Sequence, residues 1–197
     1  MNKKYGMIII VSAPSGAGKT SICDAIIRDD KNIVYSVSTT TRSPRSGEKN
    51  GREYFFVDEK TFKRDIKSGK FIEWAKVHDN YYGTSKKVLL GALSKGRDVL
   101  LDIDVQGALN IKKQYKNALM LFIMTPTLKE LKNRLIKRNK DSVKTIQTRI
   151  ENARKEIKYV HKYDYLIIND KLKESIINAK AVVKAERLSI KRNKIIF

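Results

Sequence analysis

The sequence has one cysteine, no long apolar run and few acidic residues. Because Cys23 is the only cysteine, an internal disulfide and a zinc site built from cysteines are both excluded. No stretch approaches the ~20 consecutive apolar residues that cross a bilayer. The first apolar run is too short for a secretory signal and is interrupted at Pro14 and Gly16. We therefore expect a soluble, cytoplasmic protein without a membrane partner.

The shortage of acidic residues leaves a large positive charge. Asp and Glu total 21 against 42 Lys and Arg, so the formal net charge is +21. Such an excess can attract nucleic acid or phosphorylated small molecules. The basic residues are mostly lysines spread along the whole chain, which favours a solvated surface and makes a nucleic-acid partner unlikely. The 197 residues suit one domain, and monomer and homodimer are both compatible with them.

The strongest pattern is the stretch Ile8–Thr20, which reads IIIVSAPSGAGKT. An apolar run passes into a glycine-bearing turn that ends in Gly-Lys-Thr, the form of a strand that leads into a phosphate-binding loop and a helix. Gly16 and Gly18 can adopt a positive φ, and neither has a Cβ that would obstruct phosphate oxygens. Ala13 stands where the usual pattern has glycine, but this position is remote from the Gly-Lys-Thr end.

The chemistry of such a loop is the binding of a nucleoside triphosphate. Backbone N–H groups from Ser15 to Lys19 can surround one anion, and a helix that begins near Lys19 turns its positive dipole end toward it. The ammonium of Lys19 can reach the β- and γ-phosphates, and the hydroxyl of Thr20 can bind Mg²⁺. We predict a triphosphate site formed by Ala13, Pro14, Ser15, Gly16, Ala17, Gly18, Lys19 and Thr20.

Apolar runs and helical patterns alternate along much of the chain. Runs rich in Ile, Val and Leu without strict alternation are typical of strands that are buried on both faces. Strands that alternate with helices imply right-handed crossovers and a parallel sheet, and therefore an α/β fold. The predicted strands are Met7–Ser12, Asp98–Ile103, Ala118–Thr125 and Tyr165–Asn169, with Ile33–Ser36 as a possible further strand. The predicted helices are Thr20–Arg28, Gln106–Tyr115, Leu128–Arg138, Val143–His161 and Leu172–Leu188.

The middle of the chain departs from this alternation and predicts a small inserted lobe. Its first part, Ser38–Asn50, is rich in Thr, Ser, Gly and Pro and is predicted to be a loop. The rest is predicted as a strand, a helix, a strand and a turn, at Tyr54–Val57, Asp58–Lys67, Phe71–Val77 and Asn80–Gly83.

The lobe and the end of the second core strand contain residues suited to a second phosphorylated ligand. Arg42 and Arg45, with the hydroxyls of Tyr54 and Tyr82, can hold the phosphate of a monophosphate. Glu73 lies among apolar residues, where a carboxylate can accept two N–H bonds from a guanine edge. Carboxylates at Asp102 and Asp104 can hold Mg²⁺ through water. The same arginines also suit a solvated loop, and Glu73 also suits an exposed edge strand.

A series of motifs extends over almost the whole chain: SAPSGAGKT, SVSTTTRSPRSGEKNGREYFF, FIEWA, NYYGTS, LDIDVQGA and YDYLIIND. In this order and spacing they resemble the guanylate kinase family. The resemblance implies transfer of the γ-phosphoryl group of ATP to GMP, with Mg²⁺ bound with ATP. It also implies a P-loop parallel-sheet core flanked by helices, an inserted GMP-binding lobe and a small mobile lid. The expected boundaries are 1–37, 85–133 and 155–197 for the core, 38–84 for the lobe and 134–154 for the lid.

The resemblance also implies roles for single residues. The expected catalytic residues are Lys19, Arg42 and the lid arginines Arg134, Arg138 and Arg149, and Asn169 is expected near adenine. The expected metal ligands are Thr20 and Asp102. The GMP site would comprise Ser38, Arg42, Arg45, Tyr54, Glu73, Tyr82 and Thr84, with Asp102 and Asp104 near its amino edge.

Three alternatives have distinct signatures. A kinase for AMP, UMP or dTMP would differ in its preferred acceptor, although Ser38 with Glu73 favours GMP. A non-catalytic scaffold domain of this type typically loses the phosphate-binding loop, whereas Gly16, Gly18 and Lys19 are present here. A nucleic-acid binder would show steeply salt-dependent binding of RNA or DNA. A stripe of surface charge would also account for Arg134 and Arg138, which are one helical turn apart.

Overall fold

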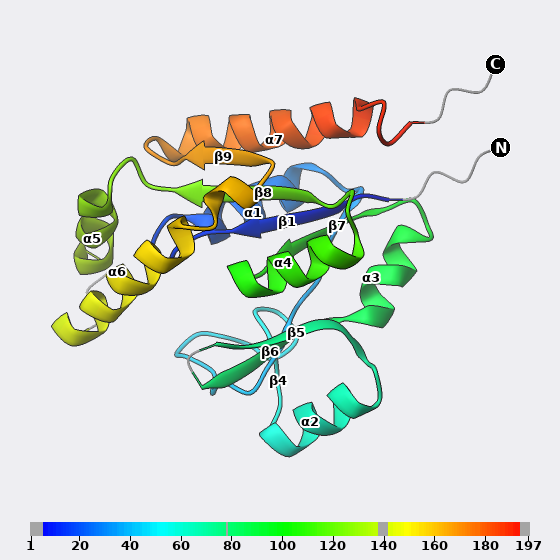
Figure 1. The fold of residues 1–197 in the computed structure, drawn as a ribbon, viewed down its shortest axis with the longest axis horizontal. Helices are drawn as coiled ribbons and strands as arrows, with labels where there is room; N and C mark the ends of the chain where they lie inside the picture. Colours follow the sequence, from blue (N-terminus) through cyan, green and yellow to red (C-terminus); the bar gives the residue numbers. More distant parts are fainter. Residues whose placement is uncertain (1–5, 78, 138–141, 194–197) are drawn as a thin grey trace. The chain divides into compact units, whose positions relative to one another are not determined.

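The computed structural model describes residues 6–77, 79–137 and 142–193, which form two compact units. The first unit consists of the described parts of 1–8, 32–101 and 106–118, and the second of 9–31, 102–105 and the described parts of 119–197. Figure 1 shows the elements of both units along the chain. The predicted boundaries of core, lobe and lid stay a prediction.

The central feature of the fold is a parallel sheet. Among the described residues, its strands are hydrogen-bonded in the order β2-β7-β1-β8-β9. The pairs β2–β7, β1–β8 and β8–β9 are parallel. Every residue of β1 and β8 is buried, as their unbroken apolar sequences predict. The predicted α/β class is therefore confirmed, with strands β1 (Ile8–Ser12), β2 (Ile33–Tyr35), β7 (Asp98–Asp102), β8 (Leu119–Met124) and β9 (Tyr165–Ile168).

The helices of the second unit begin close to where the sequence predicts. They are α1 (Lys19–Asp29), α5 (Leu128–Lys137), α6 (Val143–Ile157) and α7 (Leu172–Leu188). Helix α6 ends earlier than predicted, and a separate 3₁₀ turn covers Val160–Lys162. The apolar stripe of Ile146, Ile150 and Ala153 that buries α6 is not continued by buried residues in this turn, which removes the packing that sustains a helix.

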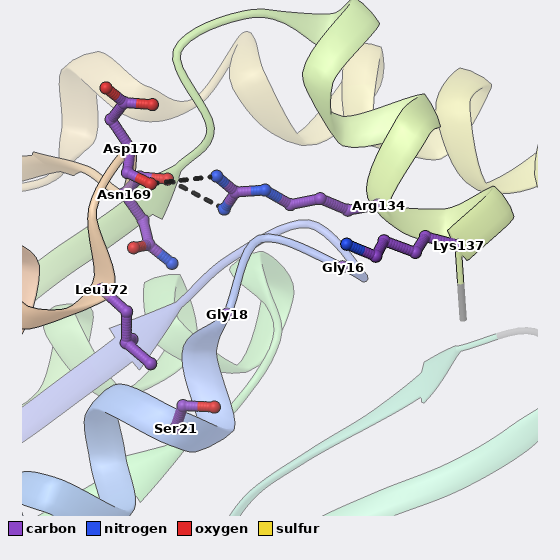
Figure 2. A pocket seen from close by; sticks show the side chains of 8 residues that line it. All are labelled: Gly16, Gly18, Ser21, Arg134, Lys137, Asn169, Asp170 and Leu172. Carbon is purple, nitrogen blue, oxygen red and sulfur yellow. Dashed lines mark hydrogen bonds between the residues drawn. The ribbon is translucent and has the colours of Figure 1, made fainter.

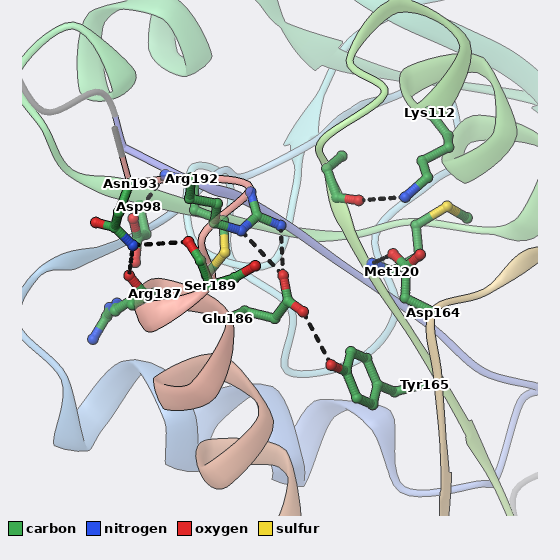
Figure 3. A network of polar contacts seen from close by, with 12 residues as sticks. Asp98, Lys112, Met120, Asp164, Tyr165, Glu186, Arg187, Ser189, Arg192 and Asn193 are labelled. Carbon is green, nitrogen blue, oxygen red and sulfur yellow. Dashed lines mark hydrogen bonds and ion pairs between the residues drawn. The ribbon is translucent and has the colours of Figure 1, made fainter. Parts of the chain in front are cut away.

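Helix α7 is fixed to its neighbours by small buried residues and by ion pairs. Ser175, Ala179 and Val183 recur every four residues and form its buried face, and α7 contacts α1 and β9. Arg187 pairs at 2.5 Å with Asp30, the residue that follows α1. Glu186 accepts a 3.0 Å hydrogen bond from the hydroxyl of Tyr165 in β9 and pairs with Arg192, as Figure 3 shows. These contacts hold the C-terminal helix against its sheet edge.

The first unit contains a second sheet, built around aromatic rings. Among the described residues its strand order is β4-β3-β6-β5. Phe62 of the neighbouring helix is fully buried and stacks on Phe71 and Tyr81, with ring centroids 4.6 and 5.4 Å away. The elements are β3 (Thr39–Thr40), β4 (Phe55–Phe56), α2 (Glu59–Lys67), β5 (Phe71–Val77) and β6 (Asn80–Ser85). The short strand β3 lies inside the stretch that the sequence predicts as a loop.

The predicted turn at Asn80–Gly83 is wrong, because these residues belong to strand β6. The glycine that suggested a turn has a packing role. A Cβ at Gly83 would lie 2.9 Å from the Phe71 ring and 3.0 Å from the Phe62 ring. The chain reverses before the predicted turn, where Asp79 has a positive φ of 65°. Only glycine allows both rings to approach the backbone this closely.

Two further helices lie wholly or mostly in the described part of the first unit. Helix α3 (Lys86–Leu93) is not predicted, because Gly91 lies inside it and glycine weakens the helical signal. Helix α4 (Val105–Gln114) begins one residue before its predicted start. Among the residues that the structure describes, no helix is both long enough and apolar enough to cross a membrane.

Candidate active site

The predicted phosphate-binding loop has the conformation that its glycines allow. Gly16 and Gly18 have positive φ angles of 97° and 95°. Helix α1 begins at Lys19, and the N–H of Ala17 donates to Pro14 O at 3.0 Å to close the turn before it. The loop therefore leads directly into the N-terminus of a helix, where free N–H groups and the positive dipole end favour an anion.

Lys19 and Asp102 form an ion pair, and both side chains are mostly buried. Asp102 ends β7, and the nearby Ser12 hydroxyl at the end of β1 donates to Ile103 O at 2.8 Å. The predicted lysine and the predicted carboxylate thus lie together beside the loop. Asp104 belongs to the same unit and is half-buried.

The oxygen atoms of Thr20 and Asp102 suit a hard cation such as Mg²⁺. Thr20 lies in the first turn of α1 and is exposed, and Asp102 is bound to the neighbouring Lys19. Within residues 6–77, 79–137 and 142–193, no three His, Cys, Asp or Glu side chains gather to hold a metal ion. This donor set therefore fits a magnesium ion that is bound partly by the phosphates of a nucleotide.

A cavity of about 340 Å³ opens beside the loop (Figure 2). Asn169 is 3% exposed, and its amide Nδ2 donates to Ala17 O in the loop at 2.7 Å. A Cβ at Gly18 would lie 2.2 Å from that nitrogen, so the amide and the loop are packed as closely as glycine allows. The predicted adenine-side residue therefore contacts the loop itself. The cavity is lined by Gly16, Gly18, Ser21, Arg134, Lys137, Asn169, Asp170 and Leu172.

The predicted lid arginines have different surroundings. Arg134 pairs with Glu130 at 2.7 Å and donates to the backbone oxygens of Asn169 and Asp170 at 2.8 and 3.2 Å, as Figure 2 shows for the two backbone contacts. Arg149 of α6 donates to the Ser15 hydroxyl at 2.7 Å, so it reaches the phosphate-binding loop. Arg138 lies outside the described residues. The predicted catalytic roles of these arginines stay a prediction.

The predicted guanine-reading residues lie in one row of the second sheet. Glu73 of β5 is paired with Thr84 of β6. The Thr84 hydroxyl donates to the Glu73 carboxylate at 2.6 Å, and both side chains are buried. Strand β3 pairs Thr39 with Gly83, and one further step of this antiparallel register brings Ser38 opposite Thr84. The interpretation of Glu73 as an exposed edge residue is therefore wrong, since this side chain is only 7% exposed.

The predicted phosphate-binding residues of the lobe gather around aromatic rings. The rings of Tyr54 and Tyr82 are 5.9 Å apart and meet edge to face. The Arg42 guanidinium lies 5.4 Å from the centroid of the Tyr54 ring and is half-buried, so it is not a solvated loop charge. Arg45 is exposed. The Glu48 carboxylate accepts hydrogen bonds from the backbone N–H of Arg45 and from the Arg42 guanidinium.

Some residues near these sites are not in the predicted set. Ser21 follows Thr20 directly, and Asp170 and Leu172 follow Asn169, so the motifs point to their neighbourhood. Lys137 directly precedes the predicted Arg138, so it also lies next to a predicted residue. The sequence gives no signal for Glu48 and Glu156, because their partners are known only once the chain has folded.

Glu156 of α6 is a half-buried carboxyl near Lys19 and Asp104. Burial raises the pKa of Glu156 to about 7, an effect that the ammonium of Lys19 opposes and the carboxylate of Asp104 increases. Since the unfolded chain loses this proton near its ordinary value, the folded state binds more protons at intermediate pH. The free energy of unfolding should therefore fall as the pH rises from about 5 to 8.

Glu156→Gln tests this pH dependence. The free energy of unfolding of the variant, relative to that of the parent protein, should rise by on the order of 2–3 kcal/mol between pH 5 and pH 8. The reason is that an amide at this position has no charge to desolvate. Denaturant unfolding at both pH values measures the difference. Glu151→Gln, at an exposed position of the same helix, is the control and should show no pH-dependent gain. A constant difference across this range would contradict the raised pKa.

Comparisons with known proteins agree over nearly the whole chain. The family profile described as guanylate kinase matches residues 5–186. The guanylate kinase of Caldanaerobacter subterraneus subsp. tengcongensis is 45% identical over 98% of this chain and 93% of its own length. That of Clostridium tetani is 43% identical over 96% of this chain and 90% of its own length.

A solved structure has the same fold. The crystal structure of guanylate kinase from Anaplasma phagocytophilum superposes with a TM-score of 0.80 at 34% identity, covering 96% of this chain and 90% of that chain. The family profile's range, residues 5–186, includes the phosphate-binding loop, Glu73 and Thr84, and the segment that carries Arg42 and Arg45. This chain belongs to the guanylate kinase family.

Proposed function

We propose that this protein transfers the γ-phosphoryl group of ATP to GMP and gives ADP and GDP. Its family supports this activity, and one structural observation supports GMP as the acceptor. That observation is the buried Glu73 carboxylate, hydrogen-bonded to Thr84. A carboxylate can accept from both the N1–H and the amino group of guanine, whereas adenine has no such pair of donors.

The triphosphate half of the reaction uses the loop before α1. Its N–H groups and Lys19 would bind the phosphates of ATP, and the cavity next to Asn169 would take the adenosine. Thr20 and Asp102 would hold Mg²⁺, which when bound neutralises charge on the phosphates. Arg149, which reaches Ser15 of the loop, would stabilise the transferring phosphoryl group.

The acceptor half uses the second sheet. Arg42, Arg45, Tyr54 and Tyr82 would bind the GMP phosphate, while the row of Ser38, Thr84 and Glu73 would bind the base. Phosphoryl transfer depends mainly on aligning the two phosphates and excluding water. Asp102 and Asp104, at the end of β7, are proposed to act near the amino edge of guanine and the metal. A cytoplasmic location is part of the same proposal.

Initial rates of ADP release, with GMP, AMP, UMP and dTMP offered in turn, test the proposal. We expect kcat/KM for GMP to exceed that for each other acceptor by about 10³-fold or more, because a buried site that hydrogen-bonds one base leaves polar groups without partners when another base enters. Comparable rates with AMP or UMP would indicate a kinase for another monophosphate. If no acceptor releases ADP, the protein is a non-catalytic member of the family.

A further inference from the structure

The Glu48 carboxylate binds both arginines that are proposed to hold the acceptor phosphate. The Arg42 guanidinium donates through Nη2 to its two oxygens, at 2.9 Å each. The backbone N–H of Arg45 donates to Oε2 of the same carboxylate at 2.8 Å. The N–H of Glu48 in turn donates to Arg45 O at 3.0 Å. One acidic side chain therefore fixes the shape of the segment 42–48.

Arg42 is held from several sides. Its Nη1 donates to Ser43 O at 2.7 Å, and the rings of Tyr54 and Phe56 lie 5.4 and 5.8 Å from its Cζ. The bonds to Glu48 and Ser43 engage Nη2 and Nη1, and the Tyr82 side chain also hydrogen-bonds the guanidinium. The remaining N–H groups of Arg42 can donate to a second anion. The contacts that fix the guanidinium plane also fix the direction of these N–H groups.

The ion pair differs from an ordinary surface pair in its burial. The side chains of Arg42 and Glu48 are only 15% and 18% exposed. Partial burial alone would raise the pKa of Glu48, but hydrogen bonds from the Arg45 N–H and the Arg42 guanidinium outweigh it and hold the pKa of the carboxyl below its ordinary value. Glu48 is therefore ionised at neutral pH and bound to Arg42 in a fixed geometry. Exposed pairs lack this fixed geometry and contribute little.

We propose that Glu48 is a positioning residue for the acceptor phosphate, which orients the Arg42 guanidinium toward this dianion and fixes the backbone at Arg45. This inference rests on the proposed function, because it assumes that both arginines bind the phosphate of GMP. A long, flexible guanidinium that is already ordered loses less conformational freedom when the ligand binds. The carboxylate also offsets the repulsion between two neighbouring cations. Glu48 itself touches no reacting atom.

Glu48→Gln tests the proposal, because it keeps the side-chain shape and one acceptor oxygen but removes the charge. Calorimetric titration should show about tenfold weaker binding of GMP, the loss typical of a hydrogen bond to a charged group. Binding of guanosine, which lacks the phosphate, should be unchanged. A purely structural disturbance of the lobe would weaken both ligands alike.

Glu53→Gln is the matched control. Glu53 lies five residues after Glu48 and accepts the N–H of Lys49 at 2.7 Å, so it also supports a backbone turn. Its carboxylate pairs with the exposed Arg52 at 3.3 Å. This variant should bind both GMP and guanosine like the parent protein. Equal losses of GMP binding in the two variants would overturn a specific role for Glu48.

A double-mutant cycle with Arg42→Ala separates positioning from independent effects. If Glu48 acts through Arg42, Glu48→Gln should weaken GMP binding less than twofold further once Arg42 is removed. A full tenfold further loss would overturn the proposal, as would GMP binding by Glu48→Gln that is equal to or tighter than that of the parent. Tighter binding would mean that the carboxylate competes with the phosphate.

Two outcomes concern the proposed function and the fold. If the parent protein binds guanosine as tightly as it binds GMP, the phosphate adds no affinity. The proposed acceptor site then fails together with this inference. If Glu48→Gln does not fold, Glu48→Asp replaces it, since a shorter carboxylate keeps the charge but cannot reach both arginines. The same selective loss of GMP binding is expected, and an unchanged affinity for GMP would overturn the proposal.

Discussion

Replacing Lys19 with methionine should lower kcat for ADP release by about 10³-fold, the loss that follows removal of a group that stabilises transition-state charge. Lys19 begins helix α1 and its side chain is 22% exposed, next to a loop whose N–H groups suit an anion. Methionine preserves most of the apolar stem but has no ammonium. The loop before the helix, with its two glycines at positive φ, fixes the position of Lys19.

The fold should survive this change. Lys19→Met leaves the Asp102 carboxylate, which is 16% exposed, without its ammonium partner, so some stability will be lost. The sheet does not depend on that pair, since β1 and β8 are buried along their whole length by apolar residues. Circular dichroism and GMP titration should give parent-like results. Lys129→Met removes one exposed charge from α5 and serves as the control. Near-normal turnover of Lys19→Met would refute the role of Lys19.

The sequence predicts the regular part of the fold well, because burial and periodicity there act locally. Strands β1 and β8 are continuous apolar runs, and α7 is predicted with its observed bounds. The failures come from residues whose conformation depends on distant partners. Gly83 resembles a turn residue in the sequence but serves the close approach of Phe71 and Phe62. Nothing within a few residues of Gly83 carries that information.

The candidate site also has one part that the sequence predicts and one part that it does not. The phosphate-binding loop is a continuous motif whose glycines determine its backbone, so its conformation is predictable from neighbouring residues. The partners of the arginines are not. Arg134 binds backbone oxygens of Asn169 and Asp170, which are 35 and 36 residues away in the chain. Single-residue roles that the family resemblance implies therefore need the measurements proposed above.

Replacing Glu73 with glutamine should raise the KM for GMP by about 100-fold and leave the KM for ATP within twofold. The carboxylate is 7% exposed and accepts the Thr84 hydroxyl at 2.6 Å, so its position is fixed before any base is bound. Guanine offers two adjacent donors and the carboxylate two acceptor oxygens. A glutamine presents one oxygen and one amino group, so in either orientation guanine loses an acceptor and a donor faces its edge. Hydrogen bonds to a charged group contribute about 1.5–3 kcal/mol each, which corresponds to a change on the order of 10- to 100-fold.

The two KM values, measured by initial rates of ADP release, distinguish base recognition from general damage. Glu59→Gln, at an exposed position of α2, is the matched control and should leave both values unchanged. Because glutamine can donate to N1 of adenine while a carboxylate cannot, Glu73→Gln should also narrow the preference for GMP over AMP. If the KM for ATP rises as much as that for GMP, Glu73 does not read the base. If the KM rises for GMP but not for ATP, and the preference for GMP over AMP falls, the base of the acceptor must lie against this carboxylate. A general loss of stability would not favour one purine over the other.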